Sequence, residues 1–203
     1  MSKRTEAIVI GGSTGALEAL QTLLPALSGA LGVSIAIVLH LMPDKPSALS
    51  AVLAWKTGLP VKEADDKEPL VAGHVYVAPP NYHLLVEKDR RFSLSVDAPV
   101  HFSRPAIDVL FESAADVFGP ALVGVLLSGA NEDGARGLAR IRAAGGTTVV
   151  QTPASSAAPQ MPEAALRLGG VDYVTPLVEL GPLLARLAAG DPAGSPPATK
   201  ERG

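Results

Sequence analysis

The sequence predicts an α/β domain in which a doubly wound, mostly parallel sheet is flanked by helices. Short apolar runs recur without alternating with polar residues, which is typical of parallel strands buried on both faces. Amphipathic stripes of helical spacing lie between these runs, as crossover helices require. Aromatic residues make up only 4% of the chain, so the core must be mainly aliphatic. The predicted strands are Ala7–Ile10, Ile35–Leu39, Val75–Val77, Ala121–Leu127 and Thr147–Val150.

Three stripes predict helices between the strands. Leucines between residues 17 and 27 recur at helical spacing and follow the first strand. A second stripe covers residues 107–118, and Ser103 is placed to cap the start of that helix. A third stripe covers residues 135–141 and stops at Gly145-Gly146, as helices commonly do.

One segment interrupts this alternation. His83–Val96 contains two strand-like runs around a charged turn, which predicts an antiparallel hairpin added to the sheet. We expect one domain over residues 1–189. The remaining residues, 190–203, are rich in Pro, Gly and Ala and are predicted to be disordered.

The composition excludes several classes of function. The chain has 203 residues, with 17 Lys and Arg against 20 Asp and Glu, so it lacks the basic excess of proteins that bind nucleic acid or anionic membranes. It has no cysteine, which excludes disulfides, thiol nucleophiles and zinc–thiolate sites. The N-terminal apolar run, Ala7–Ile10, is too short for a signal peptide or a membrane span. We therefore expect a cytoplasmic protein without membrane insertion.

Polar side chains with complementary chemistry follow three predicted strands. Ser13 follows the first strand, His40 the second, and Asp133 lies in the segment after residues 121–127. In open α/β sheets, ligands bind beyond the carboxyl ends of the strands, so these side chains are expected to converge. A serine hydroxyl needs a base to attack well, histidine can serve as that base, and a carboxylate orients the imidazole. The set predicts nucleophilic acyl transfer.

The glycine-rich loop Gly11–Gly15 has three interpretations. A dinucleotide fingerprint would need glycine where Ser13 and Ala16 stand, and a phosphate-binding Walker loop would need lysine after Gly15. The loop does match the G-x-S-x-G nucleophile elbow, in which the backbone N–H of Thr14 could stabilise an oxyanion. The order Ser, His, Asp differs from the Ser, Asp, His order of α/β-hydrolases, which disfavours that family.

Each candidate also has a structural interpretation. Serine in a glycine-rich turn is commonly a turn residue, histidine at a strand end is commonly structural, and Asp133 could simply cap a helix. Their joint placement favours the triad of Ser13, His40 and Asp133. Of the other histidines, His83 could line the cleft, whereas we expect His74 and His101 to be structural or solvated.

Six motifs, taken in order, resemble the catalytic domain of chemotaxis protein-glutamate methylesterases of the CheB type. The resemblance extends from Ala7 to Leu183 and implies a doubly wound α/β domain. It also implies that Ser13 is the nucleophile, His40 the base and Asp133 the orienting carboxylate. The motifs are "IGGSTGALEAL", "IVLHLMPD", "GHVYVAPPNYHL", "HFSRPAIDVLFESAA", "GVLLSGANEDGARGL" and "QTPASSAAPQMPEAAL".

The resemblance further implies a reaction and a partner. Members hydrolyse glutamate 5-methyl esters on chemoreceptor helices, release methanol, deamidate receptor glutamines, and use no metal or organic cofactor. We therefore expect the cytoplasmic helices of methyl-accepting chemoreceptors as the partner. Backbone N–H groups at Thr14 and around Ala130 are expected to hold the oxyanion.

The chain departs from the family pattern at a few positions. Relatives usually carry a second glycine where Ala16 stands, and T-G-M-G where this chain has Ser128–Asn131. Most relatives also carry a receiver domain before the esterase domain, and we expect a form without it. Two alternatives therefore stay open: a non-catalytic binding module of the same fold, and a hydrolase of the same mechanism that acts on another ester or amide.

Overall fold

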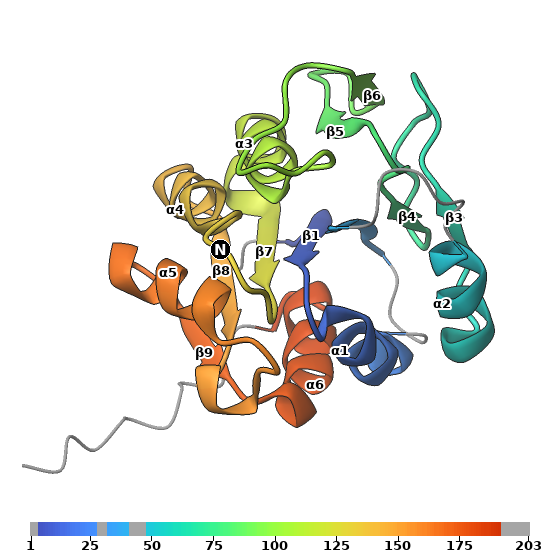
Figure 1. Ribbon diagram of the computed structural model, residues 1–203. Helices are drawn as coiled ribbons and strands as arrows, with labels where there is room; N and C mark the ends of the chain where they lie inside the picture. The colour runs from blue at the N-terminus through green and yellow to red at the C-terminus, as the bar shows by residue number, and fades with distance from the viewer. Residues whose placement is uncertain (1–3, 28–31, 41–47, 192–203) are drawn as a thin grey trace, which may run out of the picture.

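A seven-stranded parallel sheet forms the centre of the molecule (Figure 1). The computed structural model describes residues 4–27, 32–40 and 48–191. From edge to edge the strand order is β3-β4-β2-β1-β7-β8-β9. All five predicted strands are present, within one or two residues at each end. The strands are β1 (Ala7–Gly12), β2 (Ser34–Leu39), β3 (Val61–Glu63), β4 (Val75–Val77), β7 (Leu122–Leu126), β8 (Thr147–Gln151) and β9 (Tyr173–Thr175).

Helices cover both faces of this sheet, as the sequence predicts. Alternate residues of β1 point to opposite faces. Ile8 and Ile10 pack in a cluster with α1, α2 and α6, and Ala7 and Val9 pack in a second cluster with α3, α4 and α5. Both clusters are mainly aliphatic. The helices are α1 (Ala16–Leu23), α2 (Leu49–Thr57), α3 (Ile107–Phe118), α4 (Ala135–Ala143), α5 (Gln160–Leu168) and α6 (Leu177–Ala188).

The predicted hairpin is present as β5 (His83–Val86) and β6 (Phe92–Ser95), paired antiparallel. The expectation that it joins the main sheet is wrong, because β5 and β6 form a separate two-stranded sheet that packs against α3. The strand that precedes it, β4, is already paired on both sides and has no free edge to offer.

Two further predictions concern the start of α3 and the C-terminal tail. Ser103 does not cap α3: the residue at the cap position is Ala106, and no side-chain hydroxyl bonds to this helix end. The carboxylate of Asp133, far along the chain, takes that role instead. Most of the predicted disordered tail, residues 192–203, lies outside the described residues.

The strand order places a topological switch point at β1. On one side of β1 lie β2, β4 and β3, in that spatial order, and on the other side lie β7, β8 and β9. Loops leaving β1 and β7 at their carboxyl ends therefore diverge to opposite faces and open a crevice. Ser13 follows β1 and Ser128–Asp133 follows β7, so both predicted segments border this crevice.

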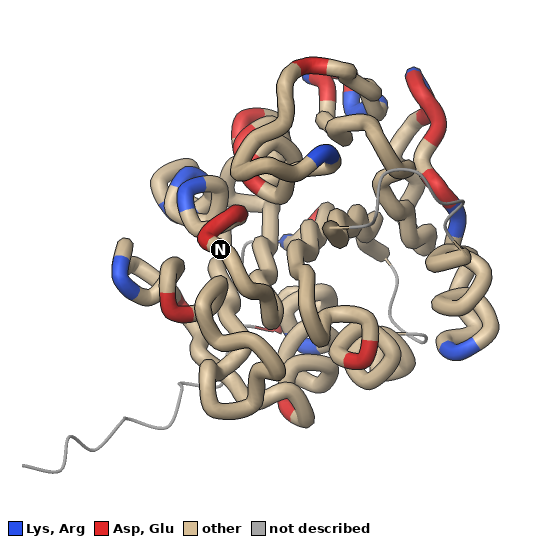
Figure 2. Tube along the Cα trace, viewed as in Figure 1, with Lys and Arg blue, Asp and Glu red and all other residues tan. Residues whose placement is uncertain are grey.

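Charged residues of both signs are spread along the outer elements of the chain (Figure 2). On the outer faces of α3 and α4 they pair across the two helices, with Arg136 beside Glu112 at 3.5 Å and Arg140 beside Asp116 at 2.5 Å. Among the described residues, no helix combines the length and the apolar character that crossing a membrane requires.

Helices α3 and α4 approach closely at Gly137. A Cβ atom at this position would lie 2.5 Å from the Cβ of Phe111 and 3.1 Å from the Cα of Asp108. Both neighbours are fixed to the backbone of α3 and cannot rotate away. This glycine therefore sets the distance between the two helices whose first turns border the crevice.

We predict that Gly137→Ala destabilises the fold by about 1–3 kcal/mol, because overpacking outweighs the helix propensity that alanine gains. The free energy of unfolding in urea measures this. Gly32→Ala is the matched control, because a Cβ at Gly32 meets no atom within 4 Å. Equal stability of Gly137→Ala and wild type would contradict the close approach.

Candidate active site

The end of β1 and the turn into α1 need glycine at three positions. A Cβ at Gly11 would lie 2.2 Å from the side chain of Ile107, and one at Gly12 would lie 2.5 Å from the Cβ of Ala16. Gly15 has a φ of 78° at the cap position of α1, a conformation that favours glycine. These constraints make a tight strand-to-helix turn and leave Ser13 partly exposed at its apex.

His40 lies beside Ser13 because β1 and β2 are parallel neighbours. The pairing of Gly12 with Leu39 makes Ser13 and His40 the next residues in register, and the backbone N–H of His40 donates to the Gly12 carbonyl at 3.3 Å. Within the described residues, the Ser13 hydroxyl forms no hydrogen bond with the imidazole. Such contacts are often long in free enzymes and shorten when substrate binds.

His40 and Asp133 are in direct contact. The Nε2 atom of His40 lies 2.8 Å from Oδ2 of Asp133, a charge-assisted hydrogen-bond distance. The side chain of His40 is 12% exposed and that of Asp133 is 0% exposed, so the pair reaches solvent only through the imidazole. The structure thus brings together the base and the carboxylate that the sequence selects.

The Asp133 carboxylate also caps α3. Its Oδ2 accepts a hydrogen bond from the N–H of Ile107 at 2.7 Å, and its Oδ1 accepts one from the N–H of Asp108 at 2.9 Å. Burial raises the pKa of Asp133, but the hydrogen bonds from His40 and from these two N–H groups outweigh it and hold the pKa below its ordinary value. Asp133 is therefore ionised at neutral pH and faces the positive end of the helix dipole.

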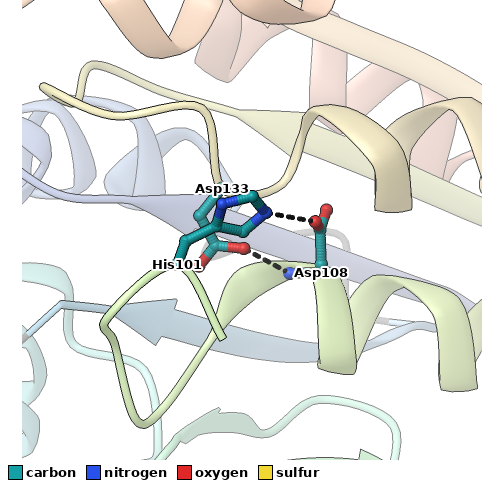
Figure 3. Close-up of side chains that lie close together, drawn as sticks. All are labelled: His101, Asp108 and Asp133. Carbon is teal, nitrogen blue, oxygen red and sulfur yellow. Dashed lines mark hydrogen bonds and ion pairs between the residues drawn. The ribbon is translucent and has the colours of Figure 1, made fainter. Parts of the chain in front are cut away.

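Asp108 completes a reciprocal cap. It lies in the first turn of α3, and its Oδ1 accepts the N–H of Gly137 in the first turn of α4 at 2.7 Å. Its Oδ2 is buried without a hydrogen bond and lies 3.3 Å from Nε2 of His101 (Figure 3). Burial raises the pKa of Asp108; the Gly137 N–H opposes the shift, and the Asp133 charge adds to it.

His101, Asp108 and Asp133 offer ligand atoms within 4.8 Å of one another, a spacing that could hold a divalent cation. Both Asp133 oxygens already accept hydrogen bonds, however, and one Asp108 oxygen accepts the Gly137 N–H. These hydrogen bonds explain why the two carboxylates lie close together: they stabilise the N-terminal ends of α3 and α4. His101 lies beside Asp108 and adds to this cluster.

A second polar network, absent from the sequence-based prediction, holds the loop after β1 that carries Ser13. Ser128, after β7, donates its hydroxyl to the Thr14 carbonyl at 2.6 Å and accepts the N–H of Ala158 at 2.8 Å. Its own N–H donates to the side chain of Gln151 at 3.0 Å. Gln151 ends β8, so the rule that found Ser13 and His40, a polar residue directly after an apolar run, could have found it too.

The two predicted oxyanion segments lie next to each other. Ser13 donates its N–H to the Ser128 carbonyl at 2.9 Å, which ties the loop after β1 to the loop after β7. Thr14 and Ala130 are both exposed. In the part of the chain that the structure describes, their backbone N–H groups donate no hydrogen bond, so both are available to a bound group.

A cavity of about 290 Å³ opens beside this site. His40 forms part of its wall, together with residues of the segment that leads into α3. Its lining residues are His40, Asn81, Pro99, Phe102, Ser103, Arg104 and Pro105. A polypeptide side chain that enters this cavity meets the imidazole of His40.

The alternative role of His83 in lining the cleft is not supported by its surroundings. The side chain is buried, its Nε2 donates to the Ala98 carbonyl at 3.1 Å, and its Nδ1 accepts the N–H of Ala106 at 3.2 Å. Both ring nitrogens are therefore occupied in holding the segment between β6 and α3. His101, beside Asp108, has the structural role expected of it.

Comparisons with known proteins agree with this geometry. The family model described as CheB methylesterase matches residues 8–184. A relative from Leptospira interrogans, provisionally named a protein-glutamate methylesterase/protein-glutamine glutaminase, is 47% identical over 90% of this chain and 94% of its own length. A protein-glutamate methylesterase/protein-glutamine glutaminase from Symbiobacterium thermophilum is 37% identical, and the match covers 88% of this chain but 49% of that protein.

A solved structure is also similar. The crystal structure of the Thermotoga maritima CheB methylesterase catalytic domain aligns with a TM-score of 0.86 and 30% identity. The alignment covers 90% of this chain and 98% of that one. The chain thus spans about half the length of some curated relatives and nearly the full length of the catalytic domain.

The surroundings of Asp108 predict a pH dependence of stability. Because its folded pKa is raised, the native state binds more protons than the unfolded state once the pH exceeds about 3.9, the ordinary Asp value. The stability of wild type relative to Asp108→Asn should therefore fall as the pH rises from about 4 towards 7. His101, Asp133 and Arg136 face the same carboxylate and are unchanged in the variant.

Urea unfolding of both proteins across this pH range measures the difference. Asp116→Asn, on the exposed face of the same helix, is the matched control for the loss of one carboxylate from α3. A difference between wild type and Asp108→Asn that stays constant or grows with pH would contradict the assignment.

Proposed function

This chain belongs to the CheB methylesterase family, and we propose that it is a serine esterase that hydrolyses glutamate 5-methyl esters on chemoreceptors. The products are glutamate and methanol. The observation that carries the proposal is the buried contact between His40 and Asp133 next to Ser13, at the switch point of the sheet. This arrangement supplies a nucleophile, a base and an orienting charge in one crevice.

In the mechanism we propose, each imidazole nitrogen has its own role. Since Nε2 of His40 is bound to Asp133, Nδ1 is the atom that takes the proton from Ser13. The Ser13 oxygen attacks the ester carbonyl, and the ionised Asp133 stabilises the imidazolium that forms. The imidazolium then protonates the leaving methoxide, which departs as methanol. Water, activated by the same nitrogen, hydrolyses the glutamyl-enzyme and regenerates Ser13.

Backbone N–H groups stabilise the oxyanion in this mechanism. The N–H groups of Thr14 and Ala130 come from adjacent loops and are not otherwise engaged with the described residues. Loss of one such donor costs about 3–4 kcal/mol in a serine hydrolase. The Ser128 hydroxyl donates to the Thr14 carbonyl, in the peptide unit after the one that carries the Thr14 N–H, and so holds the loop next to this donor. Every step uses only groups of this chain and water.

The same site serves glutamine deamidation. An amide carbonyl reaches the same glutamyl-enzyme when His40 protonates the amide nitrogen, which departs as ammonia in place of methanol. The relatives from Leptospira interrogans and Symbiobacterium thermophilum carry both activities in their names. We propose the cytoplasmic helices of methyl-accepting chemoreceptors as the partner, and the cytoplasm as the location.

Ser13→Ala is predicted to abolish methanol release from a methylated chemoreceptor fragment, because it removes the hydroxyl at the position next in register to His40. The variant should also lose covalent labelling by a fluorophosphonate probe. Ser93→Ala, whose hydroxyl accepts a hydrogen bond from Lys67 on the hairpin, is the control and should retain both signals. Labelling of wild type without methanol release would favour a hydrolase of another ester or amide. No labelling of wild type would favour a binding module.

Asp133→Asn is predicted to lower kcat by about 10⁴-fold, as loss of the triad carboxylate does in a serine protease. The asparagine amide cannot accept all three hydrogen bonds, so we also expect a loss of stability of about 1–3 kcal/mol. Methanol release is measured well below the unfolding temperature of the variant, with the folded state checked by circular dichroism. A folded Asp133→Asn protein with a kcat near that of wild type would contradict the proposed mechanism.

A further inference from the structure

A two-residue turn next to the catalytic cavity has an unusual sequence. Val100 and Ser103 exchange both backbone hydrogen bonds, at 3.1 and 2.9 Å, and the two residues between them have positive φ angles. The values are 50° for His101 and 61° for Phe102, as in a type I′ turn. Such turns favour Asn-Gly, and bulky residues in this conformation are strained. If the segment only had to reverse the chain direction, Asn-Gly would form this turn with less strain than His101-Phe102 does.

Several contacts hold this turn in place. The guanidinium of Arg104 donates from Nη1 to the carbonyls of Val96 at 2.8 Å and Asp97 at 3.1 Å. His83 donates to the carbonyl of Ala98 from beneath. His101 points from the turn towards Asp108, as Figure 3 shows. The surrounding structure therefore fixes the strained conformation from both ends of the segment.

The turn directs its two side chains differently. While His101 contacts the buried Asp108, Phe102 projects into solvent with a relative exposure of 104%. A fully exposed aromatic ring gains nothing from burial in the fold, whereas rings of this kind supply much of the binding energy at interfaces. Phe102 also lines the cavity whose wall includes His40. The ring is thus held at the entrance to the site.

We propose that Phe102 is an anchor for the receptor helix that carries the methyl ester, and so determines specificity for a polypeptide substrate. This inference rests on the proposed function. To bring a glutamyl ester to Ser13 and His40, the polypeptide that carries it must cross the rim of this cavity. The methyl leaving group is small and offers little surface for recognition. An apolar ring at the rim can pack against the apolar side chains that flank the ester on a helix.

Phe102→Gly tests this role, because glycine adopts a φ of 61° without strain. We expect the free energy of unfolding to stay the same or to increase. We expect kcat/KM for a methylated chemoreceptor cytoplasmic fragment to fall at least about tenfold, mainly through KM, as loss of an interface anchor does. The readout is the ratio of this kcat/KM to that for p-nitrophenyl acetate, which has no helix to dock.

Trp55→Ala is the matched control. Trp55 is another exposed aromatic residue, at 80%, but it lies on α2 and does not line the cavity. The ratio should fall in Phe102→Gly and stay at the wild-type value in Trp55→Ala. An unchanged ratio in Phe102→Gly, or an equal fall in both variants, would overturn the inference. If wild type releases no methanol from the receptor, the proposed function itself fails; wild-type activity is therefore measured first, which separates the two failures.

Discussion

The buried carboxylate of Asp133 carries the charge on which both the fold and the site depend. It lies where the loop after β7 meets the first turn of α3, and it accepts hydrogen bonds from two N–H groups of that turn and from His40. An ionised group without partners would be too costly at 0% exposure. Here the helix end supplies the partners, and the carboxylate stays ionised for the imidazole. The same carboxylate thus caps a helix and orients the imidazole of His40.

The parallel sheet makes this arrangement possible. Its switch point brings the loops after β1 and β7 to one edge, and the register between β1 and β2 adds His40 to them. Asp108, in the first turn of α3, accepts a hydrogen bond from the N–H of Gly137 in the first turn of α4, where the two helices approach closely. Ser128 and Gln151 fix the loop after β1 from the side of β8. The crevice is therefore shaped mainly by backbone groups that hydrogen bond to a few buried side chains.

Much of this could be predicted from the sequence, because buried parallel strands leave continuous apolar runs and their carboxyl ends share one edge. The weak edge strands β3 and β9 were missed, since three partly exposed residues leave little pattern. The cap of α3 was assigned wrongly to Ser103, because the carboxylate that supplies it comes from a segment about 25 residues away in the chain. No local signal marks His101-Phe102 as a turn, since it is not one of the Asn-Gly, Asp-Gly or Gly-Gly pairs that typically form two-residue turns with positive φ.

The dual use of Asp133 has a consequence for how related sequences diverge. A descendant that no longer hydrolysed esters would still need a carboxylate to cap α3, so selection for folding alone would preserve this residue. Ser13 contributes to the fold through its backbone groups, which other small residues also provide. In relatives that have lost activity, we therefore expect Ser13 to be substituted before Asp133. The presence of Asp133 alone should not be taken as a sign of an active enzyme.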